Sequence, residues 1–365
     1  MGLSIGIVGL PNVGKSTLFN ALTKKTVPAE NYPFCTIDPS VGIVGVPDIR
    51  LEVLSKLSGS KKIIPAAIEF VDIAGLVRGA ASGEGLGNQF LSHIRETDAI
   101  GHVVRIFEDG AVIHVDGSVQ PLRDVETIEL ELALADLQTV DKRLQNIGRD
   151  AKRGDKDALL EQSVLERIRP HLDQGKRAIT LSYTEEEFRV LRSLQLLTMK
   201  PMLYILNKKA GAYNLDEKSD PRFEELVNYI ASAGSLATIV DAKIEDELKD
   251  FSPEEQVTFR VELSAHKDGI PELISGAYKL LGLETYLTTG EVETRAWTIK
   301  KGSTAPVAGM AIHTDFKEKF IRAEVVAYED LVACGSYAAA RTQGKVRTEG
   351  KDYIVKDGDV IEFRI

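Results

Sequence analysis

The chain lacks the features that mark secreted and membrane proteins. Only two cysteines are present, Cys35 and Cys334, and they lie far apart, so we expect no disulfide framework and a reducing compartment. No run approaches the roughly 18 apolar residues that cross a bilayer. A strand-like pattern begins at Leu3, so we also expect no signal peptide. These absences favour a cytoplasmic protein without a membrane partner.

The chain also lacks an excess of positive charge. Its 45 Lys and Arg residues are outnumbered by 55 Asp and Glu residues, which gives a net charge of −10. This balance argues against adhesion to nucleic acid through bulk charge, so any contact with RNA needs a local basic patch. Hydrophobic residues at 43% and charged residues at 27% are typical of a folded globular protein. A length of 365 residues suggests two or three domains.

One motif near the N-terminus indicates a phosphate-binding loop. Residues 9–16 read Gly-Leu-Pro-Asn-Val-Gly-Lys-Ser and fit G-x-x-x-x-G-K-[ST]. A strand pattern over 3–8 precedes the motif and a helical pattern over 17–22 follows it, so successive backbone N–H groups point at one place. An ordinary glycine turn is the alternative. We predict a polyphosphate site formed by Asn12, Val13, Gly14, Lys15, Ser16 and Thr17.

Further residues complete the predicted phosphate and Mg²⁺ contacts. Lys15 is expected to reach the β- and γ-phosphates, and the Ser16 hydroxyl to bind Mg²⁺. Thr36, in the loop after the first helix, is the candidate that completes the Mg²⁺ shell when a γ-phosphate is present; a turn threonine is the alternative. A strand over 66–71 leads into a D-x-x-G pattern. Within it, Asp72 is expected to hold Mg²⁺ through water, and the Gly75 N–H to contact the γ-phosphate.

Two residues bear on how hydrolysis is triggered. Leu76 follows Gly75 at the place where Ras-like GTPases have the glutamine that orients the attacking water. Leucine cannot hydrogen-bond water, so we expect slow intrinsic hydrolysis that needs a partner or a bound cation. The amide oxygen of Asn12 could coordinate a monovalent ion beside the phosphates, with K⁺ as the activating cation; a simple turn residue is the alternative.

The base-recognition loop departs from the pattern of GTPases. A strand over 201–206 leads into Asn207-Lys208-Lys209-Ala210, where GTPases read N-K-x-D. The missing aspartate would accept two hydrogen bonds from guanine, and bonds to a charged group contribute about 1.5–3 kcal/mol each. We therefore expect ATP rather than GTP. After a strand over 236–240, Asp241-Ala242-Lys243 resembles the S-A-K loop, so Ala242 and Lys243 are predicted to line the base pocket; a plain loop is the alternative.

The segment 124–200 changes character and reads as an insertion of helices. Apolar residues recur at helical spacing over 125–144 and 159–168, with a charged turn over 146–157 and a third helix over 185–197. We predict an antiparallel helical hairpin, a coiled coil, inserted into a nucleotide domain that spans 1–281. Its tip, 142–156, holds six basic and two acidic residues, a local net of +4. A solvated loop is one reading, and a contact with RNA or the ribosome is the other.

The last segment, 282–365, reads as a small binding module. Short strands are predicted over 297–299, 322–326, 353–355 and 360–363, with one helix over 305–317. A small mixed sheet crossed by a helix is a β-grasp, ubiquitin-like arrangement, and no catalytic set is recognisable in it. The whole chain is therefore predicted to be an α/β protein: a P-loop NTPase domain with a mostly parallel sheet, a helical insertion and a C-terminal β-grasp domain.

The chain resembles the YchF/Obg-like ATPases of the translation-factor class of P-loop NTPases. The resemblance covers nearly all 365 residues and is carried by the segments 9–16, 31–39, 72–80, 83–97, 313–316 and 347–360. It implies a TGS domain at 282–365, a coiled-coil insertion, and Mg²⁺ at Ser16 and Thr36. It also implies ATP hydrolysis in preference to GTP hydrolysis, adenine contacts around Asn207 and Lys208, and binding to the ribosome and its large subunit. Leu76 fits the hydrophobic residue that this group has in place of glutamine.

Two alternatives to an ATPase that regulates translation or a stress response remain open from the sequence. One is a nucleotide-binding scaffold in which hydrolysis is incidental; Leu76 keeps it open because leucine removes the usual water-orienting group. The other is a GTPase of the Obg class. Family members usually carry N-x-x-E at the base loop, and this chain departs from that pattern at Ala210. We expect a monomer that contacts ribosomal RNA or protein through the TGS domain and the hairpin tip.

Overall fold

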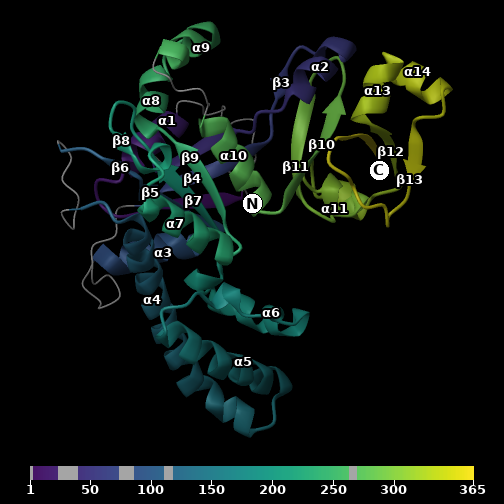
Figure 1. The fold of residues 1–365 in the computed structure, drawn as a ribbon. Helices are drawn as coiled ribbons and strands as arrows, with labels where there is room; N and C mark the ends of the chain where they lie inside the picture. Colours follow the sequence, from purple (N-terminus) through teal and green to yellow (C-terminus); the bar gives the residue numbers. More distant parts are fainter. Residues whose placement is uncertain (1–2, 24–39, 74–85, 111–117, 263–268) are drawn as a thin grey trace.

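The computed structural model describes residues 3–23, 40–73, 86–110, 118–262 and 269–365. It has a central sheet surrounded by helices, a helical arm that extends from this body, and a second sheet near the C-terminus (Figure 1). None of the described helices is long and apolar enough to cross a membrane.

The first sheet begins with the strand that precedes the phosphate-binding motif. Its strand order is β2-β4-β1-β5-β7-β9, and all neighbours are parallel except β2 and β4. The strands are β1 (Ser4–Val8), β2 (Val41–Gly45), β4 (Ala67–Asp72), β5 (Ala99–Arg105), β7 (Met202–Asn207) and β9 (Leu236–Val240). β1, β5 and β7 are buried along their whole length, as apolar strands covered on both faces should be. The predicted α/β architecture with a mostly parallel sheet is confirmed.

Helices pack around this sheet and place two of its loops together. They are α1 (Lys15–Thr23), α3 (Leu86–Glu96), α7 (Pro221–Ser232), α8 (Ala242–Leu248) and α10 (Gly269–Leu280). α9 (Pro253–Glu262) is joined to α8 by the ion pair of Arg260 with Glu245 at 2.7 Å. α1 packs against α8, and α10 packs against β7 and β9. A short antiparallel ribbon joins β6 (Phe107–Glu108) to β8 (Tyr213–Asn214). Because α1 begins at the phosphate-binding motif and α8 at the predicted base loop, their contact brings these two segments close.

The helical arm consists of α4 (Pro121–Lys152), α5 (Lys156–Asp173) and α6 (Glu185–Leu191). The predicted turn over 146–157 is wrong, because α4 continues to Lys152 and only residues 153–155 turn the chain. Ile147 and Ala151 lie one helical turn apart and are buried with Ala158 of α5, so their packing extends α4. The predicted third helix over 185–197 ends at Leu191 and continues as short 3₁₀ turns.

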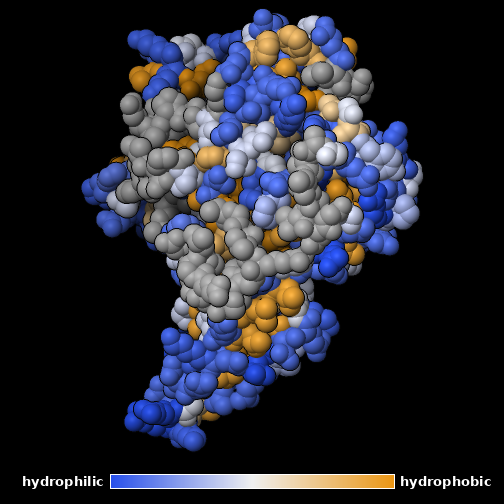
Figure 2. Space-filling view, turned by 90° about the vertical axis from the view of Figure 1, so that its left-hand side faces the viewer, coloured by the Kyte–Doolittle hydropathy of each residue, from blue (hydrophilic) through white to orange (hydrophobic). Residues whose placement is uncertain are grey.

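α4 belongs to both the body and the arm. Its first half contributes to the core of the first sheet through Val125, Ile128 and Leu132. Farther along, Val140 packs with α5. Between them the buried carboxylate of Asp136 accepts hydrogen bonds from the backbone N–H groups of Leu197 (2.9 Å) and Thr198 (2.7 Å). The surface of the arm is largely hydrophilic, with apolar side chains gathered where the arm joins the body (Figure 2).

The second sheet has the order β13-β12-β14-β10-β11-β3, and one of its strands comes from the N-terminal half of the chain. The strands are β3 (Ile63–Ile64), β10 (Leu283–Thr289), β11 (Thr294–Lys300), β12 (Arg322–Ala327), β13 (Arg347–Glu349) and β14 (Asp359–Arg364). The helices packed around it are α2 (Ile49–Ser58), α11 (Ala305–Gly309), α12 (Asp315–Glu318), α13 (Tyr328–Cys334) and α14 (Tyr337–Thr342). β3 pairs in parallel with β11, and α2 packs against β10, β11 and α13. The second sheet is therefore not made of 282–365 alone.

Two predicted elements of the C-terminal segment differ in the structure. The single helix predicted over 305–317 is two short helices, α11 and α12, which are separated by residues 310–314. The strand predicted over 353–355 is only an isolated bridge, in which Ile354 pairs with Thr304. Tyr353 turns its hydroxyl to the carboxylate of Asp359 at 2.7 Å, so this segment packs by side-chain contacts rather than by a strand ladder.

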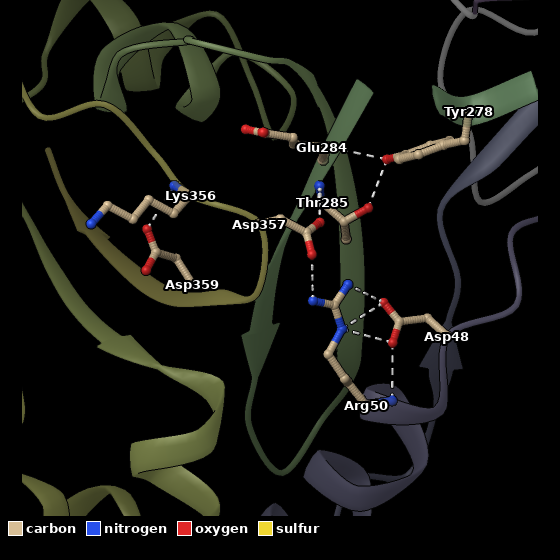
Figure 3. Close-up of polar contacts among 8 residues, drawn as sticks. All are labelled: Asp48, Arg50, Tyr278, Glu284, Thr285, Lys356, Asp357 and Asp359. Atoms are coloured by element: carbon tan, nitrogen blue, oxygen red, sulfur yellow. Dashed lines mark hydrogen bonds and ion pairs between the residues drawn. The ribbon is translucent and has the colours of Figure 1, made fainter. Parts of the chain in front are cut away.

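The guanidinium of Arg50 joins α2 to the second sheet (Figure 3). Arg50 donates to both carboxylate oxygens of Asp48, the N-cap of α2, and to Oδ2 of Asp357 at 2.7 Å. The other oxygen of Asp357 accepts the backbone N–H of Thr285 at 2.9 Å, and the hydroxyl of Thr285 lies 2.7 Å from that of Tyr278. The segment between β2 and β4, which contains α2 and β3, is thus attached to the second sheet by charge-assisted hydrogen bonds as well as by packing.

Candidate nucleotide-binding site

The loops that carry the predicted motifs meet at one edge of the first sheet. β1, β4, β7 and β9 run parallel, and their register places Ile7 beside Asp72 and Asn207 beside Val240. The residues that follow these strands therefore lie at the carboxyl edge, where open α/β sheets bind their ligands.

The phosphate-binding loop has the backbone conformation that its motif requires. Gly14 has a φ of 99°, and a β-carbon there would lie 2.3 Å from Nδ2 of Asn207, so only glycine fits. Asn12 is exposed and also left-handed, with a φ of 62°, which asparagine tolerates better than most residues. Val13 is buried, Thr17 is half-buried and Ser16 is exposed on the first turn of α1. The N-terminus of α1 thus opens at the predicted phosphate site.

Lys15 is held in place by the loop itself. Its Nζ donates to the carbonyl oxygen of Leu10 at 2.8 Å, and the side chain is buried. Burial lowers the pKa of Lys15, and the nearby carboxylate of Asp72 acts to raise it. Burial likewise raises the pKa of Asp72, and Lys15 acts to lower it. Lys15 is therefore a positioned cation beside a carboxylate from the neighbouring strand, at the predicted phosphate site.

Ser16 and Asp72 carry the oxygen ligands that Mg²⁺ prefers. The Ser16 hydroxyl is exposed at the start of α1, and Asp72 is half-buried at the end of β4. A hydroxyl and a carboxylate fit a cation that keeps several waters and is bound mainly through substrate phosphates. The described ranges contain no group of three or more His, Cys, Asp or Glu that could hold a metal ion. Thr36, Gly75 and Leu76 lie outside the described residues, so their predicted roles stay predictions.

Asn207 connects the phosphate-binding loop to the two base loops, which are the predicted base-recognition loops at residues 207–210 and 241–243. It is the last residue of β7 and is 5% exposed. Its Nδ2 donates to the carbonyl oxygen of Val13 at 2.8 Å, and its Oδ1 accepts the backbone N–H of Ala242 at 3.0 Å. The predicted site residues Val13, Asn207 and Ala242 are therefore brought together by two hydrogen bonds from one buried amide.

The loop after Asn207 is supported by a segment that follows it in the sequence. The amide of Asn214 accepts the backbone N–H of Lys209 and donates to its carbonyl oxygen, each at 3.0 Å. Lys208 forms ion pairs with Glu217 at 3.0 Å and Asp216 at 3.9 Å. Residues 214–217, Asn-Leu-Asp-Glu, could be mistaken for the base-recognition motif, but in the structure they support the loop that follows Asn207.

Asp241 connects the two base loops and was not among the predicted site residues. It is the N-cap of α8, and its Oδ1 accepts the backbone N–H groups of Lys243 at 3.1 Å and Ile244 at 3.0 Å. Its Oδ2 accepts the backbone N–H of Ala210 at 2.6 Å. An aspartate directly before a helical pattern is a recognisable N-cap signal. The bond to Ala210 has no sequence signal, because 31 residues separate the two.

Comparison with known proteins agrees with this geometry. Residues 4–153 match a family model described as "50S ribosome-binding GTPase", and residues 283–365 match the model YchF-GTPase_C, described as a protein of unknown function. The chain is 52% identical over 368 residues to "Ribosome-binding ATPase YchF" of Bacillus subtilis (strain 168), with 100% of this chain and 99% of that protein covered. It is 42% identical over 364 residues to "Obg-like ATPase 1" of Oryza sativa subsp. japonica, with 99% and 92% covered.

A solved structure has the same arrangement over the full length. "Structure of the Schizosaccharomyces pombe YchF GTPase" superposes with a TM-score of 0.87 at 37% identity and covers 100% of this chain and 98% of that one. The phosphate-binding loop at the carboxyl edge of a mostly parallel sheet, and this similarity from end to end, show that the chain belongs to the YchF family of P-loop NTPases.

Proposed function

We propose that this chain is an ATPase that hydrolyses ATP to ADP and phosphate and binds the ribosome through its large subunit. The observation that carries the first part is the link that Asn207 makes between the phosphate-binding loop and the base loops, with Lys15 buried beside them. The second part rests on relatives that are named ribosome-binding ATPases and match the chain over its whole length.

Different residues of the site would bind the phosphates, the metal ions and the base of the triphosphate. The backbone N–H groups of residues 13–17 and the Nζ of Lys15 face the phosphates and offset their charge. Ser16 and Asp72 would hold Mg²⁺, with Thr36 as the third predicted contact, and the ion supplies neutralisation of charge on the phosphate oxygens. Asn12 is the proposed ligand for K⁺. Ala242, Lys208 and Lys243 surround the predicted position of the base.

The proposed preference for ATP rests on Ala210. The side chain that accepts two hydrogen bonds from guanine in N-K-x-D is absent at this position. The backbone N–H of Ala210 is paired with Asp241 rather than left for a ligand. A GTPase is the competing function, because the family model and the solved relative both carry that description.

Phosphate release by the purified full-length chain tests this proposal. We expect ATP to be hydrolysed faster than GTP at equal concentration, with stimulation by ribosomes and by K⁺ in place of Na⁺. The matched control is the chain with ribosomes and no nucleotide. Faster hydrolysis of GTP would establish the GTPase, and the absence of stimulation under every condition would favour a nucleotide-binding scaffold.

The tip of the arm is the proposed contact with ribosomal RNA or protein, together with the C-terminal TGS domain. Arg143 is neutralised there by a two-bond pair with Glu161, at 2.6 and 2.8 Å. Arg149, Lys152 and Lys156 are exposed and have no ion-pair partner among the described residues. Arg153 is also exposed and lies 3.6 Å from Asp150, a distance at which a surface pair is weak. The positive charge of the tip is therefore available to a polyanion.

Reversing this charge should weaken ribosome binding without changing the affinity for ATP. For Lys152→Glu combined with Arg153→Glu we expect about a tenfold loss in co-sedimentation with ribosomes, and a smaller difference from wild type at high salt. Lys218→Glu combined with Lys279→Glu makes the same charge change on exposed residues of the body and serves as the control. Unchanged co-sedimentation would remove the tip from the proposal and leave the TGS domain as the contact.

The assembly and location that accompany this function are proposed with it. A monomer in the cytoplasm, where ribosomes are met, is the state in which this chain would act as a nucleotide-dependent regulator of translation or of a stress response.

A further inference from the structure

The carboxylate of Asp241 accepts several hydrogen bonds from the backbone of the two base loops. Its side chain is 8% exposed, and it accepts three backbone N–H groups. Two of these belong to the first turn of α8, and the third belongs to Ala210 in the other loop. A single carboxylate therefore caps a helix and fixes the distance between the two loops that flank the predicted base.

The backbone N–H groups near Asp241 are hydrogen-bonded to acceptors within the protein. The N–H groups of Ala210, Lys243 and Ile244 are paired with Asp241, and the N–H of Ala242 is paired with Oδ1 of Asn207. A carboxylate offers about four lone-pair sites, so one acceptor site is left on Oδ2 of Asp241. Asn207 Oδ1 likewise keeps one lone pair. The backbone N–H groups of Ala210 and of residues 242–244 are therefore unavailable to a base, whereas acceptor sites on Asp241 and Asn207 remain.

Adenine and guanine differ in the hydrogen-bonding group that they would present to the acceptors of Asp241 and Asn207. Adenine carries an amino group at position 6, which donates, whereas guanine carries an oxygen at position 6, which accepts. A buried acceptor that meets no donor loses the free energy of its hydration. The carboxylate of N-K-x-D can form two bonds with guanine because both of its oxygens are free. Asp241 has one site left, so it cannot form that pair of bonds.

We propose that Asp241 is a specificity-determining residue, which selects a 6-amino purine over a 6-oxo purine by occupying backbone N–H donors of both base loops. The proposal rests on the proposed function, because it requires a purine nucleoside triphosphate to bind between these loops. The acidic group that sets base preference then comes from the loop after β9, and not from the fourth position of the loop after β7, where the chain has Ala210.

Substitution of Asp241 by asparagine gives a direct test. Asparagine is as good a helix N-cap as aspartate, so α8 keeps its cap. If the amide oxygen retains that role, the amide nitrogen faces Ala210 and adds a donor where an acceptor stood. We expect Asp241→Asn to bind ATP about tenfold more weakly while binding of ITP and GTP is unchanged or stronger. The dissociation constants of all three triphosphates are measured on the full-length protein with Mg²⁺ present.

Two further variants separate base selection from a general loss of structure. Asp155 caps α5 by accepting the N–H of Ala158 at 2.8 Å, far along the arm, so Asp155→Asn should leave all three dissociation constants unchanged. Asp241→Ser keeps a capping oxygen but loses the bond to Ala210, and its ITP-to-ATP ratio of dissociation constants should fall between wild type and Asp241→Asn. Melting temperatures verify that the variants fold.

The outcomes distinguish this inference from the function on which it rests. A fall in the ITP-to-ATP ratio of about tenfold in Asp241→Asn supports base selection by Asp241. An equal loss for the three nucleotides, or no loss, overturns it and leaves a purely structural cap. Equal affinity of the wild-type chain for ATP and ITP overturns it too, while ATP binding itself stands. If the wild-type chain binds none of the three, the proposed function fails and this inference fails with it.

Discussion

Replacing Lys15 with methionine should lower the rate of nucleotide hydrolysis about a hundred- to a thousandfold and leave the fold as stable as before. Methionine keeps an unbranched apolar side chain in the loop and removes the charge. The charge of Lys15 is the group predicted to face the β- and γ-phosphates, where negative charge is redistributed in the transition state. A variant that unfolds would lose activity for a different reason, so the melting temperature is measured alongside phosphate release.

The stability of the Lys15 variant follows from burial. Burial lowers the pKa of Lys15, which means that the surroundings disfavour its charged form. Removing a buried charge whose remaining contacts are one carbonyl and a nearby carboxylate should therefore cost little stability or even raise the melting temperature.

Lys200 offers a matched control for this substitution. Its pKa is also lowered by burial, and its Nζ donates to the backbone carbonyl oxygens of Arg95 (3.0 Å) and Thr97, away from the phosphate-binding loop. Lys200→Met removes a half-buried ammonium that also donates to backbone carbonyl oxygens, and it should leave hydrolysis within about twofold of wild type. Equal losses in the two variants would show that Lys15 acts through the fold and not through the phosphates.

Asn207→Asp should weaken the binding of ATP and GTP alike, by about a hundredfold. The change replaces the Nδ2 donor by an oxygen that carries negative charge and faces the carbonyl oxygen of Val13, now 2.8 Å from Nδ2. Losing that hydrogen bond and placing two oxygens together costs on the order of 3 kcal/mol, which corresponds to about a hundredfold in affinity. The strain falls on the phosphate-binding loop, so the loss does not depend on the base.

Equilibrium titration with both nucleotides checks this prediction, and Asn228→Asp is the control. Asn228 is exposed on α7, so its change adds the same charge without touching the loop. A loss confined to one nucleotide would contradict the role of Asn207 as a brace and would move it into base recognition. The contrast with Asp241→Asn, which should change the ratio between bases, separates the two roles.

Much of the first sheet and of its loops was predictable from the sequence, because residues close together in the chain determine these elements. Strand-like patterns indicated β1, β4 and β7, and G-x-x-x-x-G-K-[ST] indicated a glycine loop that opens a helix. The arm was predicted with its turn misplaced. A stretch rich in charge predicted a turn over 146–157, whereas packing of Ile147 and Ala151 against α5 continues the helix to Lys152.

The C-terminal segment was the least predictable, because its elements are short and their partners are distant in sequence. β3 is two residues long and joins the second sheet through β11, more than 200 residues farther along. Arg50 and Asp357 are separated by 307 positions, and no local pattern announces their contact. Composition indicates that small strands and turns are present, but the pairing of edge strands is decided by packing.

The sequence alone determined that this chain has a phosphate-binding loop, a departure from N-K-x-D at Ala210 and the residue types that could hold Mg²⁺. Each of these depends on residues close together in the chain, where spacing implies geometry. Only the tertiary structure decided that Asn207 braces Val13 to Ala242, and that Asp241 takes the N–H of Ala210. Both contacts exist because parallel strands deliver their loops to the same edge of the sheet, which brings together residues that the sequence keeps apart.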